Sequence, residues 1–345
     1  MDLNIPDIDG IGLLQYMKDQ QAQSEVILMS GVEDRILESA QSFANSIGIT
    51  IAGRFQKTIR LSDFELLLKA WTTPKIAKVE QASEKHEFLV TREELLRGIQ
   101  NNEFVTFYQP KIDIASRGFY GVEALVRWNH PVHKITYPDN FIPQTESLGL
   151  MNELTWLIIR NAIKEISWLQ EQIQFPFKLG LNLSPGSLED QSCSKQLIDI
   201  IDEYSIPAEN IIIEITESGL MDELSSALAI FTRLRLKNIH LSIDDFGTGY
   251  AMMQQLKLIP ATELKIDKSF VQNMLIDNSA RVTVQKVIEI GHELGMKVVA
   301  EGVETKEHLQ WLQRYHCDIA QGYYFSKPIP LVELQQWIST NYKLD

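Results

Sequence analysis

Residues 178–183 read Lys178-Leu179-Gly180-Leu181-Asn182-Leu183, a short apolar run with a polar side chain near its end. Similar runs recur towards the C-terminus, and amphipathic segments with helical spacing separate them. Continuous apolar strands that alternate with helices are typical of a parallel sheet that is covered on both faces. The further runs are 211–215, 240–244, 263–267, 297–301 and 318–322, and the helical segments include 196–204, 223–237, 281–294 and 306–315.

The region upstream of these runs predicts two more strands and one long helix. Residues 105–112 and 120–128 are strand-like and are joined by a turn at 116–118, and residues 152–170 follow as a helix. About eight strands in about 250 residues favour a closed β/α (TIM-like) barrel over an open sheet. We therefore predict an α/β protein whose barrel domain covers residues 87–345.

The first 75 residues predict a smaller α/β domain. Segments 25–30 and 49–55 are strand-like, and segments 35–47 and 62–71 have helical spacing. The composition then becomes polar and charged, so we expect residues 1–75 to form one domain and residues 76–86 to form a linker.

Composition limits the classes of function. The chain has 345 residues and a formal net charge of −14, which disfavours binding to nucleic-acid polymers. No apolar stretch approaches the roughly 20 residues of a membrane helix, and the N-terminus does not resemble a signal peptide. Cys193 and Cys317 are too few for a disulfide framework or a zinc site. We expect a cytoplasmic protein with reduced thiols and no membrane partner.

Polar side chains lie at or just before the end of nearly every predicted strand. In a β/α-barrel the C-terminal ends of the strands meet on one face, where such enzymes keep their active sites. Each of these side chains alone has an ordinary structural explanation, such as capping a helix or pairing with a lysine. That explanation would have to hold independently on almost every strand. The residues are Glu123, Asn182, Glu214 with Glu217, Asp244 with Asp245, Lys265 with Asp267, Glu301 with Glu304, and Gln321.

The chemistry of this set favours hard divalent cations. Carboxylate and amide oxygens suit Mg²⁺ or Mn²⁺ rather than zinc. The adjacent Asp244 and Asp245 would let one carboxylate bridge two metal ions, which together can activate a water molecule and stabilise a leaving oxygen. Lys265 among carboxylates would stay charged, and could orient that water or stabilise negative charge.

The ordered motifs resemble those of the EAL-domain phosphodiesterases. The signature Glu123-Ala124-Leu125-Val126-Arg127 starts a series that extends over roughly residues 87–342. Each motif alone is weak, but their order and spacing together are specific. The others are Asn182-Leu183-Ser184, Glu214-Ile215-Thr216-Glu217, Asp244-Asp245-Phe246-Gly247-Thr248-Gly249-Tyr250, Leu264-Lys265-Ile266-Asp267, Ala300-Glu301-Gly302-Val303-Glu304 and Gln321-Gly322-Tyr323.

The resemblance implies hydrolysis of cyclic di-GMP to linear pGpG with two Mg²⁺ or Mn²⁺ ions. It implies catalytic roles for Lys265 and Glu301, without deciding which is the base, and a fold of the EAL barrel type. Asp267 lies in a family motif, with a role that could be structural. Ala251-Met252 stand where the family usually carries serines, which puts the mobility of the loop in doubt. The implied metal ligands are Glu123, Asn182, Glu214, Asp244, Asp245 and Glu301; the implied substrate contacts are Gln109, Arg127 and Gln321; and Glu217 is implied to anchor the loop 245–250.

Two other functions remain open from the residues. One is a receptor that binds cyclic di-GMP without hydrolysing it, although binding alone does not require a water-activating group. The other is an unrelated metal-dependent barrel enzyme such as an enolase-type lyase, for which the order of the motifs gives no support. The resemblance also implies a homodimer.

The N-terminal segment resembles part of a response-regulator receiver domain of the doubly wound type. Asp2 is the candidate phosphoacceptor, Ser30 resembles the switch hydroxyl, and Lys57 resembles the conserved lysine, although Thr58 replaces the usual proline. A sensor histidine kinase would then be a partner. The first strand of a receiver, with its acidic Mg²⁺-binding pair, is absent from this sequence. We therefore expect no phosphorylation of Asp2, whether the domain is a reduced form or its start is missing.

Overall fold

The computed structural model divides into two compact units, Met1–His86 and Glu87–Asp345, and each is described by itself. In the second unit the structure describes residues 90–222, 224–247 and 256–342. The predicted helix 62–71 and the predicted linker 76–86 lie outside the described residues. In the first unit the described residues are 1–2, 10–20, 22, 24, 26–31, 37, 40–41, 43–45 and 47–57.

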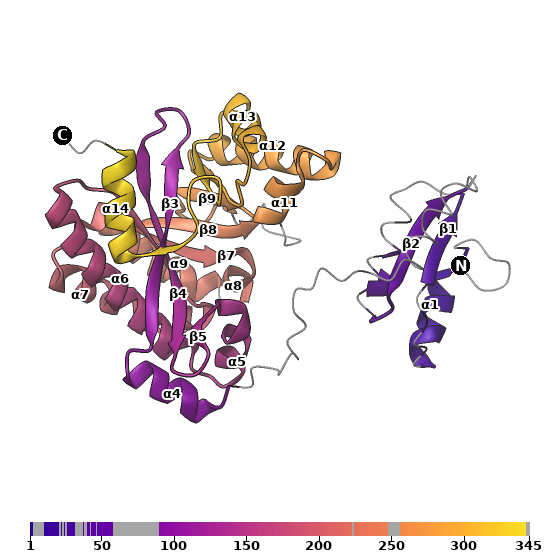
Figure 1. Cartoon of the computed structure of the whole chain (residues 1–345), viewed down its shortest axis with the longest axis horizontal. Coiled ribbons are helices and arrows are strands. Elements are labelled where there is room, and N and C mark those ends of the chain that lie inside the picture. Colours follow the sequence, from indigo (N-terminus) through magenta and orange to yellow (C-terminus); the bar gives the residue numbers. More distant parts are fainter. Residues whose placement is uncertain are drawn as a thin grey trace. The chain divides into compact units, whose positions relative to one another are not determined.

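The larger unit is an eight-stranded barrel, as predicted (Figure 1). The barrel closes because the first strand pairs with both the second and the last. Two short strands, β5 (Lys134–Thr136) and β12 (Ile329–Pro330), extend it at β4 and β3. In sheet order the barrel strands are β3 (Phe104–Asp113), β4 (Phe119–His130), β6 (Lys178–Asn182), β7 (Ile211–Thr216), β8 (His240–Phe246), β9 (Glu263–Ile266), β10 (Lys297–Ala300) and β11 (Ile319–Gln321).

The first strand, β3, is the exception to the parallel order, because it runs antiparallel to both β4 and β11. The cause is the short connection after Asp113, whose carboxylate accepts hydrogen bonds from the backbone N–H and the hydroxyl of Ser116. Such a tight turn can join only antiparallel strands, because a parallel pair needs a long crossover. The polar side chains of β3 therefore enter the barrel from a strand of opposite direction.

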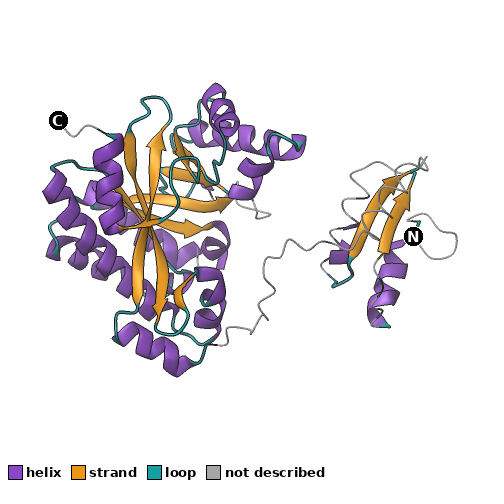
Figure 2. Cartoon of the chain, viewed as in Figure 1, coloured by secondary structure: helices purple, strands orange, loops and turns teal. Residues whose placement is uncertain are grey.

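Helices cover the outside of the barrel (Figure 2). The long helix predicted over 152–170 is α6, and the segments predicted as helical between later strands are confirmed as α7, α9, α12 and α13. Two longer helices outside the predicted set are α4, which Thr91 and Glu94 begin with a capping box, and the C-terminal α14. The helices are α4 (Arg92–Gln100), α5 (Ile142–Ser147), α6 (Met151–Ile173), α7 (Cys193–Glu203), α8 (Glu217–Asp222), α9 (Leu224–Leu236), α11 (Lys268–Asn273), α12 (Asn278–Glu293), α13 (Lys306–Arg314) and α14 (Leu331–Asn341).

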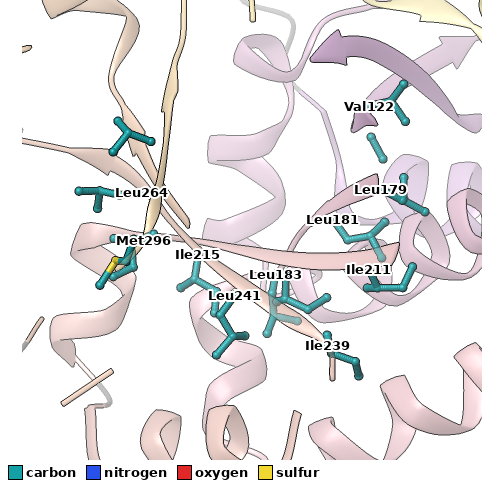
Figure 3. Close-up of a cluster of buried hydrophobic side chains, with 14 of the residues drawn as sticks. Val122, Leu179, Leu181, Leu183, Ile211, Ile215, Ile239, Leu241, Leu264 and Met296 are labelled. Carbon is teal, nitrogen blue, oxygen red and sulfur yellow. The ribbon is translucent and has the colours of Figure 1, made fainter. Parts of the chain in front are cut away.

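The main core lies between the barrel and these helices (Figure 3). Because strand side chains alternate between faces, the apolar residues of each strand point outward into this core and the intervening residues point into the barrel. On β7, for example, Ile211, Ile213 and Ile215 belong to the core, so Glu214 faces inward. The same alternation brings the predicted polar residues to the interior of one rigid scaffold.

The N-terminal unit contains two parallel strands and a helix. Strand β1 (Val26–Ser30) pairs with β2 (Ile51–Gln56), and α1 (Gly10–Asp19) contributes Leu14 to a small core with Leu28. The ammonium of Lys57 donates a hydrogen bond to the carboxylate of Asp2. Among the described residues of the chain, no helix is both long and apolar enough to cross a membrane.

Candidate active site

Lys265 lies at the centre of the polar residues inside the barrel. Its Nζ is 2.5 Å from Glu214 Oε2, 2.7 Å from Glu301 Oε1, 2.9 Å from Asp244 Oδ2 and 3.4 Å from Glu123 Oε2. The lysine side chain is fully buried. Burial alone would lower the pKa of Lys265, but the four carboxylates together raise it well above its ordinary value. The structure thus holds a permanently charged ammonium at the carboxyl ends of the strands.

The carboxylates around this lysine form two overlapping groups. One contains Glu123, Glu214 and Asp244, and the other contains Asp244, Asp245 and Glu301. In each group the oxygen atoms that could bind a cation lie within 4.8 Å of one another. A donor set made of oxygens alone suits a hard divalent cation, and Asp244 belongs to both groups.

Asn182 is the amide of the predicted ligand set. It stands at the end of β6, and its Nδ2 donates a hydrogen bond of 2.9 Å to Glu123 Oε1. The structure therefore brings together all six residues that the sequence predicted as metal ligands.

The carboxyl groups of the site differ in their pKa values. Burial disfavours the charged form of Glu123, but Lys265 and Lys111 outweigh burial and lower its pKa to about 2. Burial raises the pKa of Glu214 to about 7 and that of Glu301 to about 8, against the attraction of the lysines. Burial and the neighbouring Asp244 raise the pKa of Asp245 to about 6. Glutamates of one site are thus held in different protonation states by their surroundings.

A cavity of about 520 Å³ opens above the carboxylates, which is within the range of small-molecule sites. Gln321 joins its wall to the acids, because its Nε2 donates hydrogen bonds to Gln109 Oε1 at 2.9 Å and to Glu123 Oε2 at 2.7 Å. Gln109 Nε2 in turn donates to the backbone oxygen of Ser326 at 3.2 Å. Both predicted glutamines therefore line the cavity.

Arg127 supplies positive charge to the same cavity. Its guanidinium lies over the rings of Phe107 and Tyr137, with 5.6 Å and 5.1 Å to the ring centroids. Its Nη1 also donates to the backbone oxygen of Val126 at 2.7 Å. Stacking on the two rings restricts the side chain, so the charge is held at a defined place.

Glu217 contacts the loop that follows β8. It begins α8, and its Oε2 accepts a hydrogen bond of 3.0 Å from the backbone N–H of Gly247. Residues 248–255, which include Ala251 and Met252, lie outside the described residues. Asp267 caps α11 by accepting a hydrogen bond from Ser269 N at 2.9 Å, so its contact is structural.

Lys111 and Glu263 are interior residues that the sequence prediction missed. Lys111 is fully buried and contacts Glu214 at 2.5 Å and Glu263 at 3.7 Å. Strand alternation could have found Lys111, because it stands two positions after Gln109 and so faces the same way. Glu263 stands two positions before Lys265 and could have been found in the same manner.

Comparison with known sequences identifies one protein family. The sequence pattern of the EAL domain matches residues 92–328. RocR of Pseudomonas aeruginosa, a cyclic di-GMP phosphodiesterase, is 30% identical over 329 residues, which cover 95% of this chain and 83% of RocR. The oxygen sensor protein DosP of Escherichia coli is 36% identical over 255 residues, which cover 74% of this chain but only 32% of DosP.

Solved structures agree with the sequence comparisons. The PaMucR phosphodiesterase in its c-di-GMP complex superposes with a TM-score of 0.67 and 31% identity, over 70% of this chain and 98% of that one. The EAL enzyme Bd1971 in its cAMP and cyclic-di-GMP bound form gives a TM-score of 0.68 and 30% identity, over 80% of this chain and 75% of that one.

Proposed function

This chain belongs to the EAL domain family, and from that premise we propose that it hydrolyses cyclic di-GMP to linear pGpG. The observation that carries the proposal is the cluster of five ionisable side chains at the base of the cavity. Glu123, Glu214, Asp244 and Glu301 surround Lys265 within 3.4 Å of its ammonium. RocR supports the same reaction, since it is named for this activity and this chain covers 83% of its length.

Two divalent cations, Mg²⁺ or Mn²⁺, fit the oxygen donors. We assign one to Glu123, Asn182, Glu214 and Asp244, and the other to Asp244, Asp245 and Glu301, in accordance with the two groups of neighbouring oxygens. Bound there, such ions lower the pKa of water and stabilise the negative charge that develops on a phosphoryl group.

The residues of the chain have distinct tasks in this reaction. The water oxygen attacks phosphorus, the bond from phosphorus to the 3′ oxygen breaks, and the 3′ oxygen takes up a proton. Lys265 is held protonated, so it donates hydrogen bonds to anionic oxygens and does not accept a proton. Glu301, whose Oε1 lies 2.7 Å from Lys265 beside Asp244, is the group that we assign to take the proton of the water.

We assign substrate binding to polar residues that line the cavity. Arg127 pairs with a phosphate of the nucleotide, where its stacked guanidinium offers several N–H donors. Gln109 and Gln321 contribute amides beside Glu123 and complete the polar surface. Glu217 holds the loop after β8 by accepting a hydrogen bond from Gly247, two positions after Asp245.

The alternative is a receptor that binds cyclic di-GMP without cleaving it. The PaMucR and Bd1971 complexes contain the cyclic nucleotide and so fit either activity. The arrangement of Lys265 and Glu301 favours hydrolysis, because nucleotide binding alone does not need a charged lysine buried among four acids.

A single substitution tests the metal assignment. Glu123→Gln removes one ligand charge and replaces one acceptor oxygen by an NH2 donor, but keeps the shape of the side chain. We expect turnover to fall more than about 100-fold, since metal ions contribute several kcal/mol to such transition states. Circular dichroism should show an intact fold. Glu171→Gln, on the exposed side of α6, is the matched control and should keep full activity. Normal turnover by the Glu123 variant would refute the metal assignment.

For the N-terminal unit we propose a receiver-like regulatory role without phosphorylation of Asp2; a sensor histidine kinase would be a partner only if Asp2 accepted a phosphoryl group. The ion pair between Lys57 and Asp2 supports the receiver-like role. We expect incubation with acetyl phosphate to leave the intact mass of the chain unchanged, and a gain of one phosphoryl group would contradict this expectation and support the kinase as a partner. We also propose a homodimer, which light scattering coupled to size exclusion would contradict by showing monomer alone.

A further inference from the structure

Lys111 is a second buried lysine in the barrel, below the proposed metal site. It projects inward from β3, and its side chain is completely inaccessible to solvent. Its Nζ lies 2.5 Å from Glu214 Oε1 and 3.7 Å from Glu263 Oε1. A buried ammonium is stable only when acidic groups compensate its charge, and these two glutamates do so.

Glu214 is consequently held at both ends of its carboxylate. Lys111 contacts Oε1, and Lys265 contacts Oε2, each at 2.5 Å. A planar carboxylate with a charged donor on each oxygen cannot rotate without breaking both contacts. The position of Oε1 beside Lys111 therefore fixes the direction of Oε2.

Gly180 on β6 makes room for this arrangement. A Cβ at this position would lie 1.9 Å from Glu214 Oε1 and 3.1 Å from Lys111 Nζ. The carboxylate thus rests directly against the backbone of β6, and any larger residue would push it away. Lys111 and Gly180 thus contact Oε1 of Glu214 from two sides.

We propose that Lys111 is a positioning residue, which fixes Glu214 Oε1 against Gly180 and thereby presents Oε2 to the metal bound by Glu123 and Asp244. This inference rests on the proposed function, because it takes Glu214 as a metal ligand. Lys111 acts only on the group that contains Glu214, so the group of Asp244, Asp245 and Glu301 does not depend on it directly.

Glu263 makes a clean test feasible. It is the second acid beside Lys111, and its other oxygen, Oε2, lies 3.4 Å from the hydroxyl of Tyr120. Removing Lys111 alone would leave Glu263 buried without its cation, which would endanger the fold. The double variant Lys111→Met/Glu263→Met removes one charge of each sign, so the net charge of the interior is unchanged.

Mn²⁺ binding to the full chain, stripped with chelator and measured by isothermal titration calorimetry, is the readout. We expect the double variant to bind Mn²⁺ roughly 10–100-fold more weakly than the wild type, as is usual when a group that orients a ligand is lost. Glu263→Gln alone is the matched control. It keeps the contact between Lys111 and Glu214 and should change affinity less than about twofold.

A double-mutant cycle with Glu214→Gln shows whether the effect passes through that residue. If Lys111 acts by positioning Glu214, the double variant adds almost nothing once Glu214 is already changed. Gly180→Ala gives an independent route, because it displaces the same oxygen without removing the charge of Lys111, and it should also weaken Mn²⁺ binding.

Equal Mn²⁺ affinity of a folded double variant and the wild type would overturn the proposal. An effect that persists in full without Glu214, or that Glu263→Gln reproduces, would also overturn it, because the lysine would then serve only charge balance. If the wild type itself bound no Mn²⁺, the metal assignment of the proposed function would fail as well. Nucleotide turnover does not enter this measurement, so failure to hydrolyse cyclic di-GMP remains a separate result.

Discussion

At the level of single residues, the acids of the site show how far burial and neighbours separate identical groups. Glu123 and Glu301 both contact Lys265, yet the pKa of Glu123 is about 2 and that of Glu301 about 8. Glu123 also accepts hydrogen bonds from Asn182 and Gln321, which favour its charged form. The division supports Glu123 as a fixed anionic ligand and Glu301 as a group that exchanges a proton.

The raised pKa values predict how stability depends on pH. A folded-state pKa of about 7 for Glu214 and about 8 for Glu301 exceeds the roughly 4.3 of an unfolded glutamate. Between these values the folded state binds more protons than the unfolded state, so the free energy of unfolding falls as pH rises. With chelator present, we therefore expect a higher Tm near about pH 6 than near about pH 8.5.

Thermal unfolding followed by circular dichroism measures this dependence. Glu301→Gln should flatten it, because its amide does not titrate. Glu307→Gln, which changes an exposed glutamate of α13, should leave it as in the wild type. A Tm that rises with pH over this range would contradict the assignment.

Most residues of the site were predictable because they stand at or near the C-terminal ends of barrel strands, which meet on one face; Glu123 lies within the longer strand β4. Lys111 was missed, although alternation from Gln109 places it on the inward face of its strand. Its contact with Glu214, 103 positions along the chain, could not be predicted from the strand, because it depends on the register of β3 against its neighbours.

At the level of elements, local patterns predicted the strands and the long helices well, because apolar periodicity reports burial directly. The direction of β3 follows from the turn predicted at 116–118, since direction depends on the length of a connection and not on the composition of the strand. Helix α4 was missed although Thr91 and Glu94 form a capping box. The spacing Thr-x-x-Glu could have been recognised as a capping box. The helix after it is short and has few buried residues.

The packing of α12 on β10 gives a prediction for an element away from the site. A Cβ on Gly291 would lie 2.4 Å from Val298 Cγ2 in the core. Gly291→Ala should therefore lower the free energy of unfolding by about 1–3 kcal/mol through overpacking. Denaturant titration measures this loss. Gly186→Ala is the control, since its Cβ would meet nothing within 4 Å. Equal stability of the two variants would contradict the packing.

At the level of the whole molecule, the described residues of the two units have separate cores. Leu14, Leu28 and Leu37 belong to the core of Met1–His86, whereas the larger clusters lie entirely in Glu87–Asp345. The order of the two domains along the chain could be predicted from the sequence, because the composition changes between them.

Separate cores predict that residues 87–345 fold without the first unit. We expect the isolated fragment to be monodisperse, to unfold cooperatively, and to retain nucleotide turnover within a few-fold of the full chain. Size exclusion, thermal unfolding and the turnover assay check this in turn. An aggregated fragment with no cooperative transition would show that the barrel depends on the N-terminal unit.

The most direct test is to incubate the purified chain with cyclic di-GMP and Mn²⁺, with and without chelator, and to separate the nucleotides by chromatography. The cluster of Glu123, Glu214, Asp244 and Glu301 around Lys265 predicts linear pGpG in the first reaction and intact cyclic di-GMP in the second. Cyclic di-GMP that binds tightly but is recovered intact from both reactions would contradict hydrolysis and establish the chain as a receptor.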